Sequence, residues 1–109
     1  MKFKEYEDAV RVTADYPIVG EKFVYPTLGL VGEAGEVAEK VKKLFRNDGG
    51  IVTDVHREEI KKELGDVLWY MAALSHELGF ALDDVAEANI AKLRSRLERG
   101  VIKSSGDNR

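Results

Sequence analysis

Hydrophobic residues recur every three or four positions in four segments of the chain, and this spacing predicts four amphipathic helices. Both prolines, Pro17 and Pro26, lie in the first quarter, so nothing after them forbids long helices. No alternating run of strand length appears. The pattern therefore predicts an all-α fold with a four-helix bundle-like arrangement. The expected helices run from Phe3 to Ala14, from after Thr27 to Phe45, from after Thr53-Asp54 to Leu78, and from Asp83-Asp84 to a stop at Gly100.

Residues at the ends of these segments match the preferences of helix termini. Thr27 is expected to be the N-cap of the second helix, because its hydroxyl can accept a hydrogen bond from a free backbone N–H. Asp84 and Glu87 have the spacing of a capping box at the start of the fourth helix. Gly79 is expected to end the third helix in the left-handed conformation.

The second and third helices repeat one pattern at an offset of 30 residues. Leu30 aligns with Ile60, and each segment then carries the order Glu, apolar, Gly, acid, Val, apolar. Acids three positions apart lie about 60° apart on a helix, and here their face borders the hydrophobic stripe. If the two helices pack antiparallel, the two acid pairs converge. The aligned positions are Glu33 with Glu63, Gly35 with Gly65, and Glu36 with Asp66.

Four convergent carboxylates repel one another unless a cation lies between them. All-oxygen ligands suit Mg²⁺ or Mn²⁺, and no Cys or His stands nearby at ligand spacing. Gly35 and Gly65 each cost about 0.5–1 kcal/mol relative to Ala in a helix, and close helix approach or access for a ligand would explain them. The alternative is a solvated acidic face, in which Glu36 pairs with Lys40. The shared glycines and the shared stripe favour a metal site.

Composition excludes several other kinds of site. There are 17 Lys and Arg against 20 Asp and Glu, a net charge of −3, which disfavours a nonspecific duplex-DNA binder. The absence of cysteine excludes a disulfide scaffold, a thiolate zinc site, an iron–sulfur cluster and a cysteine nucleophile. No apolar run approaches the ~20 residues of a membrane span, and the first residues do not form a signal peptide. We therefore expect a cytoplasmic protein with neither a membrane nor a nucleic-acid partner.

The length of 109 residues fits a single domain over 1–109, with residues 100–109 expected as a flexible tail. A chain of this size buries only about two-thirds of its unfolded surface, so packing against other copies would stabilise it. The small core also leaves apolar residues over, namely Ala38, Phe45, Leu68 and Trp69. A homodimer or homotetramer is expected.

The duplicated motif resembles that of the MazG-like nucleoside triphosphate pyrophosphohydrolases, which belong to the all-α NTP pyrophosphatase superfamily. In this chain the motif consists of Gly32-Glu33-Ala34-Gly35-Glu36-Val37-Ala38-Glu39 and Glu63-Leu64-Gly65-Asp66-Val67-Leu68-Trp69-Tyr70. The resemblance implies Mg²⁺-dependent hydrolysis of an NTP to the monophosphate and pyrophosphate. It also implies that Glu36 accepts the proton of the attacking water, and that the metal ligands are Glu33, Glu36, Glu63 and Asp66.

Candidate substrate contacts lie on the third and fourth helices. Asn89, Lys92 and Arg96 fall within about 60° of one another, beside the apolar stripe of the last helix. Relatives carry a comparable Lys-x-x-x-Arg that contacts phosphates, so the resemblance implies this role here. Tyr70 lies on the acid-bearing face of its helix and is predicted to contact the base or sugar, whereas Trp69 is expected to point elsewhere, into a subunit interface.

Two other functions remain open at this point. A non-catalytic helical interaction module would explain the amphipathic helices, although not the duplicated acids and glycines. A phosphatase that releases orthophosphate would use a metal in the same way, and product analysis separates the two enzymes. For the pyrophosphohydrolase, the expected role is nucleotide-pool cleansing or regulation.

Overall fold

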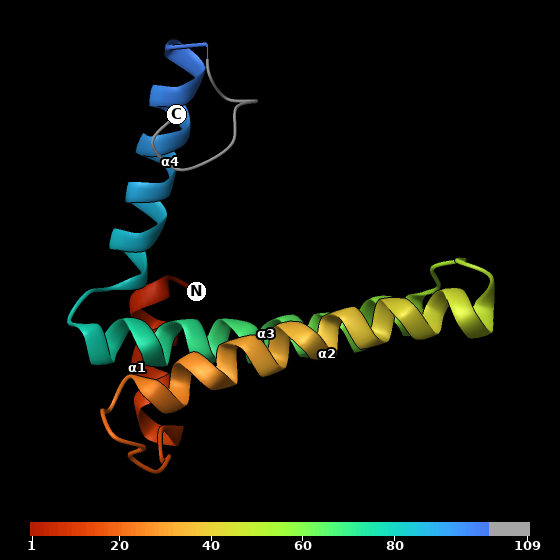
Figure 1. Ribbon diagram of the computed structural model, residues 1–109, viewed down its shortest axis with the longest axis horizontal. Helices are drawn as coiled ribbons and strands as arrows, with labels where there is room; N and C mark the ends of the chain where they lie inside the picture. The colour runs from red at the N-terminus through yellow and green to blue at the C-terminus, as the bar shows by residue number, and fades with distance from the viewer. Residues whose placement is uncertain (101–109) are drawn as a thin grey trace.

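The computed structural model describes residues 1–100 and is built from four helices (Figure 1). Within this range there is no β-strand, only an isolated bridge between Val19 and Glu21, so the all-α prediction is confirmed. The tail prediction falls almost wholly on residues 101–109, outside the described residues. The helices are α1 (Phe3–Thr13), α2 (Val24–Asp48), α3 (Asp54–Leu78) and α4 (Leu82–Glu98).

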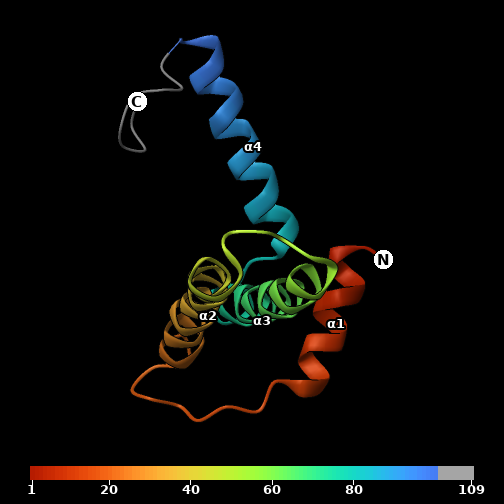
Figure 2. The ribbon, with the colours of Figure 1, turned by 90° about the vertical axis from the view of Figure 1, so that its right-hand side faces the viewer.

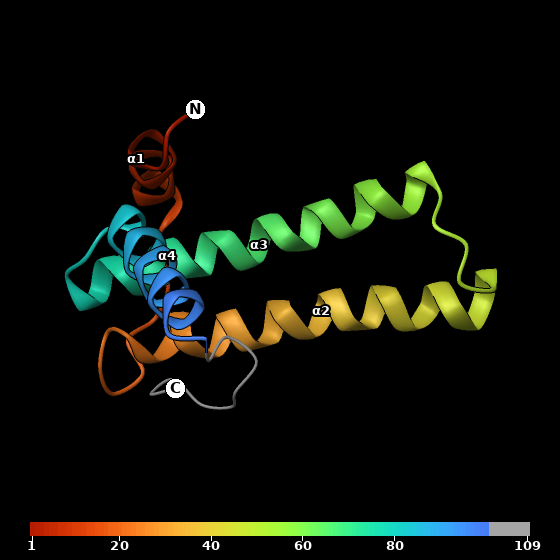
Figure 3. The same cartoon turned by 90° about the horizontal axis from the view of Figure 1, so that it is seen from above.

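The two long helices, α2 and α3, run antiparallel side by side (Figure 3). The turn between them begins with Gly49 and Gly50, whose φ angles of 63° and 81° lie in the left-handed region that favours glycine. A Cβ at Gly50 would also overlap the ring of Phe45, which packs over it. These glycines therefore allow α2 to stop and the chain to reverse within a few residues.

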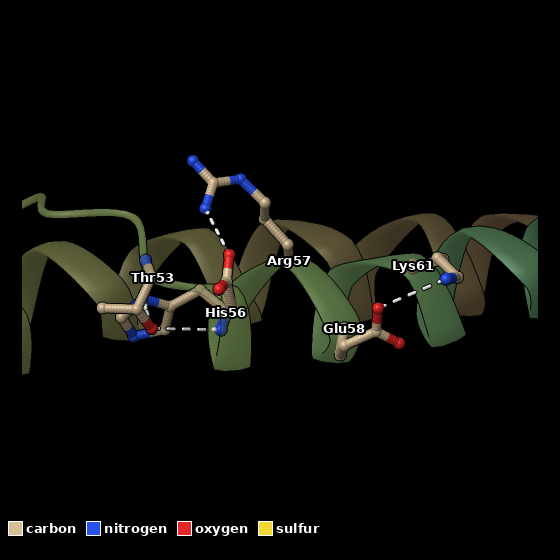
Figure 4. Close-up of polar contacts among 6 residues, drawn as sticks. Thr53, His56, Arg57, Glu58 and Lys61 are labelled. Atoms are coloured by element: carbon tan, nitrogen blue, oxygen red, sulfur yellow. Dashed lines mark hydrogen bonds and ion pairs between the residues drawn. The ribbon is translucent and has the colours of Figure 1, made fainter.

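His56 joins the two ends of this hairpin. The His56 N–H donates to Thr53 Oγ1 (3.4 Å), and the Thr53 N–H donates back to His56 Nδ1 (3.0 Å), which caps α3. Because Nδ1 accepts, Nε2 carries the ring proton and donates to Asp48 at the end of α2 (3.0 Å). Figure 4 shows Thr53 and His56 at this turn, with Arg57 and the Glu58–Lys61 ion pair further along α3.

The core lies where α1 and the start of α4 meet α3. Val10, Ala72 and Leu82 are buried there, one from each of these helices, and Tyr6, Leu68, Trp69 and Met71 pack against them. Leu68 and Trp69 therefore contribute to the core of this chain, contrary to the expectation that they are left over from it. Phe45, by contrast, is 66% exposed.

Helix α4 rises away from the α2–α3 hairpin (Figures 1 and 2). Among the described residues it contacts α1 and α3 but not α2. Its stripe stays largely uncovered, with Ile90 46% and Leu97 69% exposed. The four helices thus do not close into one bundle within a single chain, because the short turn at Gly79 (φ 85°) directs α4 outwards and only its first residue, Leu82, enters the core.

Two predicted helix starts are wrong. Helix α2 begins at Val24, and Thr27 is already helical, its hydroxyl donating to the Phe23 carbonyl (2.8 Å). Pro26 therefore lies in the first turn, where its missing N–H costs no helical hydrogen bond. Helix α4 begins at Leu82, and Asp84 accepts from the Ala81 N–H (2.9 Å) instead of starting the helix.

None of the helices described here is both long enough and apolar enough to cross a membrane.

Candidate metal centre and its pocket

Three carboxylates meet across the α2–α3 seam. Glu33 comes from α2, while Glu63 and Asp66 come from successive turns of α3. Each offers one oxygen atom, and the three oxygens lie within 4.8 Å of one another. The antiparallel packing thus brings together acids that are about 30 residues apart in the chain.

Glu36 stands outside this group of three. Its side chain is exposed, and its oxygens do not meet the other carboxylates at the same spacing. It remains close enough to act electrostatically, because its charge contributes to the raised pKa of Glu33. The structure therefore separates the four predicted ligands into three convergent acids and one neighbouring acid.

The convergent acids repel one another. Partial burial of the Glu33 carboxyl raises its pKa above the usual range, and the charges of Asp66, Glu63 and Glu36 raise it further. Within residues 1–100 none of these four carboxylates forms an ion pair. Lys42 and Lys43 instead bind Glu39. The interpretation that neighbouring lysines neutralise the acidic face is therefore not supported.

The donor set fits a hard divalent cation. Mg²⁺ takes oxygen ligands at 2.0–2.1 Å in an octahedron, so oxygens bound to one ion lie up to about 4.2 Å apart. The 4.8 Å limit on the three carboxylate oxygens is close to this value, so small side-chain rotations would suffice. Oxygen-only ligands favour Mg²⁺ or Mn²⁺ over softer metals.

Gly35 and Gly65 do not lie at a close approach of α2 to α3. This is contrary to the first of the two explanations offered for them, close packing of the helices. A Cβ at either position would meet nothing within 4 Å, and both residues are exposed. The seam between the helices instead runs along the half-buried stripe that includes Ile60, Val37 and Val67.

A pocket of about 380 Å³ opens beside the acids. It is lined by Thr13, Glu33, Asp66, Trp69 and Tyr70. Tyr70 thus lies next to the acids, as its position on the helix predicts. Trp69 also lines this pocket, which corrects the expectation that it points elsewhere.

Gly29 gives Tyr70 the space to pack against α2, a role that the hydrophobic pattern of the chain did not reveal. A Cβ at Gly29 would overlap the Tyr70 ring, so only glycine lets that ring lie against α2. Burial, followed by Tyr25 and Glu33, raises the pKa of Tyr70, so its hydroxyl stays protonated and able to donate. A glycine inside a helix one turn before Glu33 was the available signal.

The predicted phosphate contacts lie on α4, apart from this pocket. Asn89 and Lys92 line a different pocket of about 580 Å³, together with Phe80 and Val85. Arg96 is buried near the end of α4. Because α4 does not contact α2 among the described residues, a single chain does not bring these three residues to the acids.

The family model for the MazG nucleotide pyrophosphohydrolase domain matches residues 26–101. The chain belongs to the MazG family. This membership indicates nucleotide pyrophosphohydrolase activity in general. The chain is also 49% identical to the Gene 37 protein of Mycobacterium phage L5, over 95% of this chain and 96% of that protein, whose name states no activity. No solved structure matches.

The seating of Tyr70 in this MazG domain is testable with two glycine variants in one helix. Gly29→Ala should lower the free energy of unfolding or displace Tyr70, because the new Cβ overlaps its ring. Gly32→Ala adds a Cβ in open space, so it should stabilise the protein by about 0.5–1 kcal/mol. Urea unfolding measures both. Stabilisation by both substitutions would contradict the close contact.

Carboxylate repulsion in the metal-free protein is testable by neutralising one acid. Glu33→Gln keeps the side-chain volume and removes one charge, so it should raise the Tm by roughly 1–5 °C in EDTA. Glu59→Gln is the control, since Glu59 is exposed on α3 outside the group of three acids. A lower Tm for Glu33→Gln would contradict the repulsion.

Proposed function

We propose that this chain is a Mg²⁺-dependent nucleoside triphosphate pyrophosphohydrolase, which hydrolyses an NTP or dNTP to the monophosphate and pyrophosphate. One observation carries the proposal: three carboxylates, which have no cationic partner within residues 1–100, converge beside an aromatic-lined pocket in a chain of the MazG family. Mn²⁺ would serve the same donor set. The cellular role we propose is nucleotide-pool cleansing or regulation, and a single cytoplasmic domain over residues 1–109 stays a prediction.

The four acids take two roles in this proposal. Glu33, Glu63 and Asp66 hold the ion through their convergent oxygens, and Glu36 stands close enough to serve as a fourth ligand or as a base. Bound Mg²⁺ supplies charge neutralisation at the phosphates and lowers the pKa of a water. Glu36 is our candidate for the group that accepts the proton of that water, because it lies outside the tight group and keeps its lone pairs accessible.

The substrate is placed by residues around the acids. Tyr70 contacts the base or sugar from the pocket beside Glu33 and Asp66. Asn89 and Lys92 bind phosphate oxygens. Arg96 is buried in this chain, so it joins them only if its guanidinium is uncovered in the oligomer, where it can bind two oxygens at once. Helix α4 stands away from the hairpin of its own chain. We therefore propose that its residues bind the phosphates of a nucleotide held by the acids of a second copy.

A homodimer or homotetramer accords with the uncovered surface of the chain. Val31 and Leu64 are 67% and 53% exposed on the hairpin, and Ile90 and Leu97 are exposed on α4. Burying such apolar surface contributes roughly 25 cal/mol per Å². A second copy that covers both surfaces would place α4 of one chain against the hairpin of the other.

The metal role is testable by four isosteric variants. Glu33→Gln, Glu63→Gln, Asp66→Asn and Glu36→Gln should each lower kcat by about 10²-fold or more, because each removes an anionic ligand or base at nearly constant volume. The assay follows a panel of canonical and damaged NTPs and dNTPs with Mg²⁺, and ³¹P NMR identifies the products.

Glu59→Gln, on the same helix as Glu63, is the matched control and should keep wild-type turnover. Near-normal Mg²⁺-dependent turnover in all four acid variants would show that the metal site is misplaced. Orthophosphate as the first product would favour the phosphatase, and no turnover of any nucleotide would favour the non-catalytic interaction module.

The assignment of α4 to a second copy is testable by mixing two inactive variants. Glu63→Gln lacks an acid, whereas Lys92→Ala lacks a phosphate contact. If the site joins two chains, random exchange makes half of the dimers mixed, each with one intact site, and about a quarter of wild-type activity returns.

Native mass spectrometry, which resolves the small mass difference between the variants, confirms that mixed oligomers form in that experiment, and size-exclusion chromatography with light scattering gives the size of the oligomer. Mixed oligomers without recovered activity would mean that the acids and α4 of one chain serve the same site. A compact monomer at micromolar concentration would refute the oligomer itself.

A further inference from the structure

Trp69 lies at the boundary between the core and the acid pocket. It packs against the buried cluster of Val10, Ala72 and Leu82, and it also lines the pocket that contains Glu33 and Asp66. It is the only tryptophan of the chain. Its position places an aromatic side chain in the wall of the pocket, together with Glu33 and Asp66.

A hydrogen bond from α3 to α1 fixes the orientation of this indole. Trp69 Nε1–H donates to Thr13 Oγ1 (2.9 Å). The Thr13 hydroxyl in turn donates to the Val10 carbonyl (3.1 Å), so its proton is already used and a lone pair faces the indole. Thr13 is therefore a defined acceptor for Trp69.

Two tyrosines also restrict the orientation of the Trp69 indole. Tyr70 packs edge-on against Trp69, with ring centroids 5.0 Å apart and an interplanar angle of 81°. Tyr16 does the same at 6.2 Å and 84°, and its own hydroxyl donates to Glu77 (2.7 Å). The indole is thus preorganised before any ligand arrives, so binding orders few side chains.

The pocket combines two chemistries that occur together in a nucleotide. Its acids suit a metal-bound phosphate chain, and its aromatic wall suits a planar base, which can stack on any aromatic face. No Lys or Arg is among the described residues that line it, so bare phosphate would find no cation there. Its volume of about 380 Å³ lies in the range of small-ligand pockets.

We infer that Trp69 forms the stacking wall of a nucleobase slot and that Thr13 is the positioning residue that holds its indole in place. This inference rests on the proposed function, because it assigns the base of the same nucleotide. Thr13 lies before residues 26–101, which match the family model. The orientation of the wall is therefore set by a segment of this chain outside the matched domain.

The single tryptophan allows direct observation of the slot. An α,β-imido nucleoside triphosphate, which resists cleavage, should cause a saturable decrease in Trp69 emission in the presence of Mg²⁺. Inorganic tripolyphosphate with Mg²⁺ has no base, so it should bind with a much smaller change in emission. Calorimetry gives the affinity of each probe independently of fluorescence.

Four variants separate stacking from general damage to the fold. Trp69→Leu removes the aromatic wall, and Thr13→Val removes the acceptor at constant shape. Both should raise Kd for the imido nucleotide and KM for the substrate, by about tenfold for Trp69→Leu, with a smaller effect on kcat. Thr13→Ser restores the hydroxyl and should recover wild-type values. Val12→Ala, at an 86% exposed neighbour, is the control.

The affinity of each variant for Mg²⁺-tripolyphosphate distinguishes a nucleobase slot from a purely structural role of Trp69 and Thr13. It should stay unchanged in Trp69→Leu and Thr13→Val, since Trp69 contacts only the base and Thr13 acts through the Trp69 indole. Equal weakening of both probes, or turnover with unchanged KM in both variants and no change in Trp69 emission when the wild-type protein binds the nucleotide, would overturn the slot and leave the proposed function standing. Neither turnover nor calorimetric binding of any nucleotide would overturn both.

Discussion

Repulsion between carboxylates at the α2–α3 seam is the constraint on which the rest of this molecule depends. Glu33, Glu63 and Asp66 meet there without a Lys or Arg partner among the described residues, and burial together with the charges of the neighbouring acids raises the pKa of Glu33. Such an arrangement persists only if the register of the hairpin is held elsewhere. The glycine turn and the bridge from His56 to Asp48 hold it at one end, and the core around Val10 holds the other end of α3.

The architecture leaves the chain open on the surfaces that a nucleotide enzyme would use. The acids face an aromatic pocket, whereas the cationic residues of the last helix stand on an arm that contacts α1 and α3 but not α2 among the described residues. Exposed apolar residues such as Val31 and Leu97 lie on both parts. These facts support the proposal that two copies complete each other, with acids from one chain and cations from its partner at the triphosphate.

Periodicity and the 30-residue repeat predicted the long helices and the meeting of the acids, because both depend on local spacing and one antiparallel contact. The direction of α4 depends instead on the short turn at Gly79, and the amphipathic pattern of the helices does not predict the geometry of that turn. The prediction that Thr27 is an N-cap was wrong because proline is tolerated within the first turn of a helix, so α2 can begin before Pro26. The roles of Trp69 and Gly29 depend on contacts between helices that no single-helix projection shows.

The central claim is that the convergent acids hold a divalent cation beside a nucleotide. The most direct measurement is a crystal structure with Mn²⁺ and a non-hydrolysable nucleoside triphosphate, in which anomalous scattering locates the metal. The account predicts an anomalous peak bonded to Glu33, Glu63 and Asp66, at about 2.0–2.3 Å from their oxygens, and to phosphate oxygens of the nucleotide. A bound nucleotide with its metal elsewhere, or with no metal at these carboxylates, would contradict it.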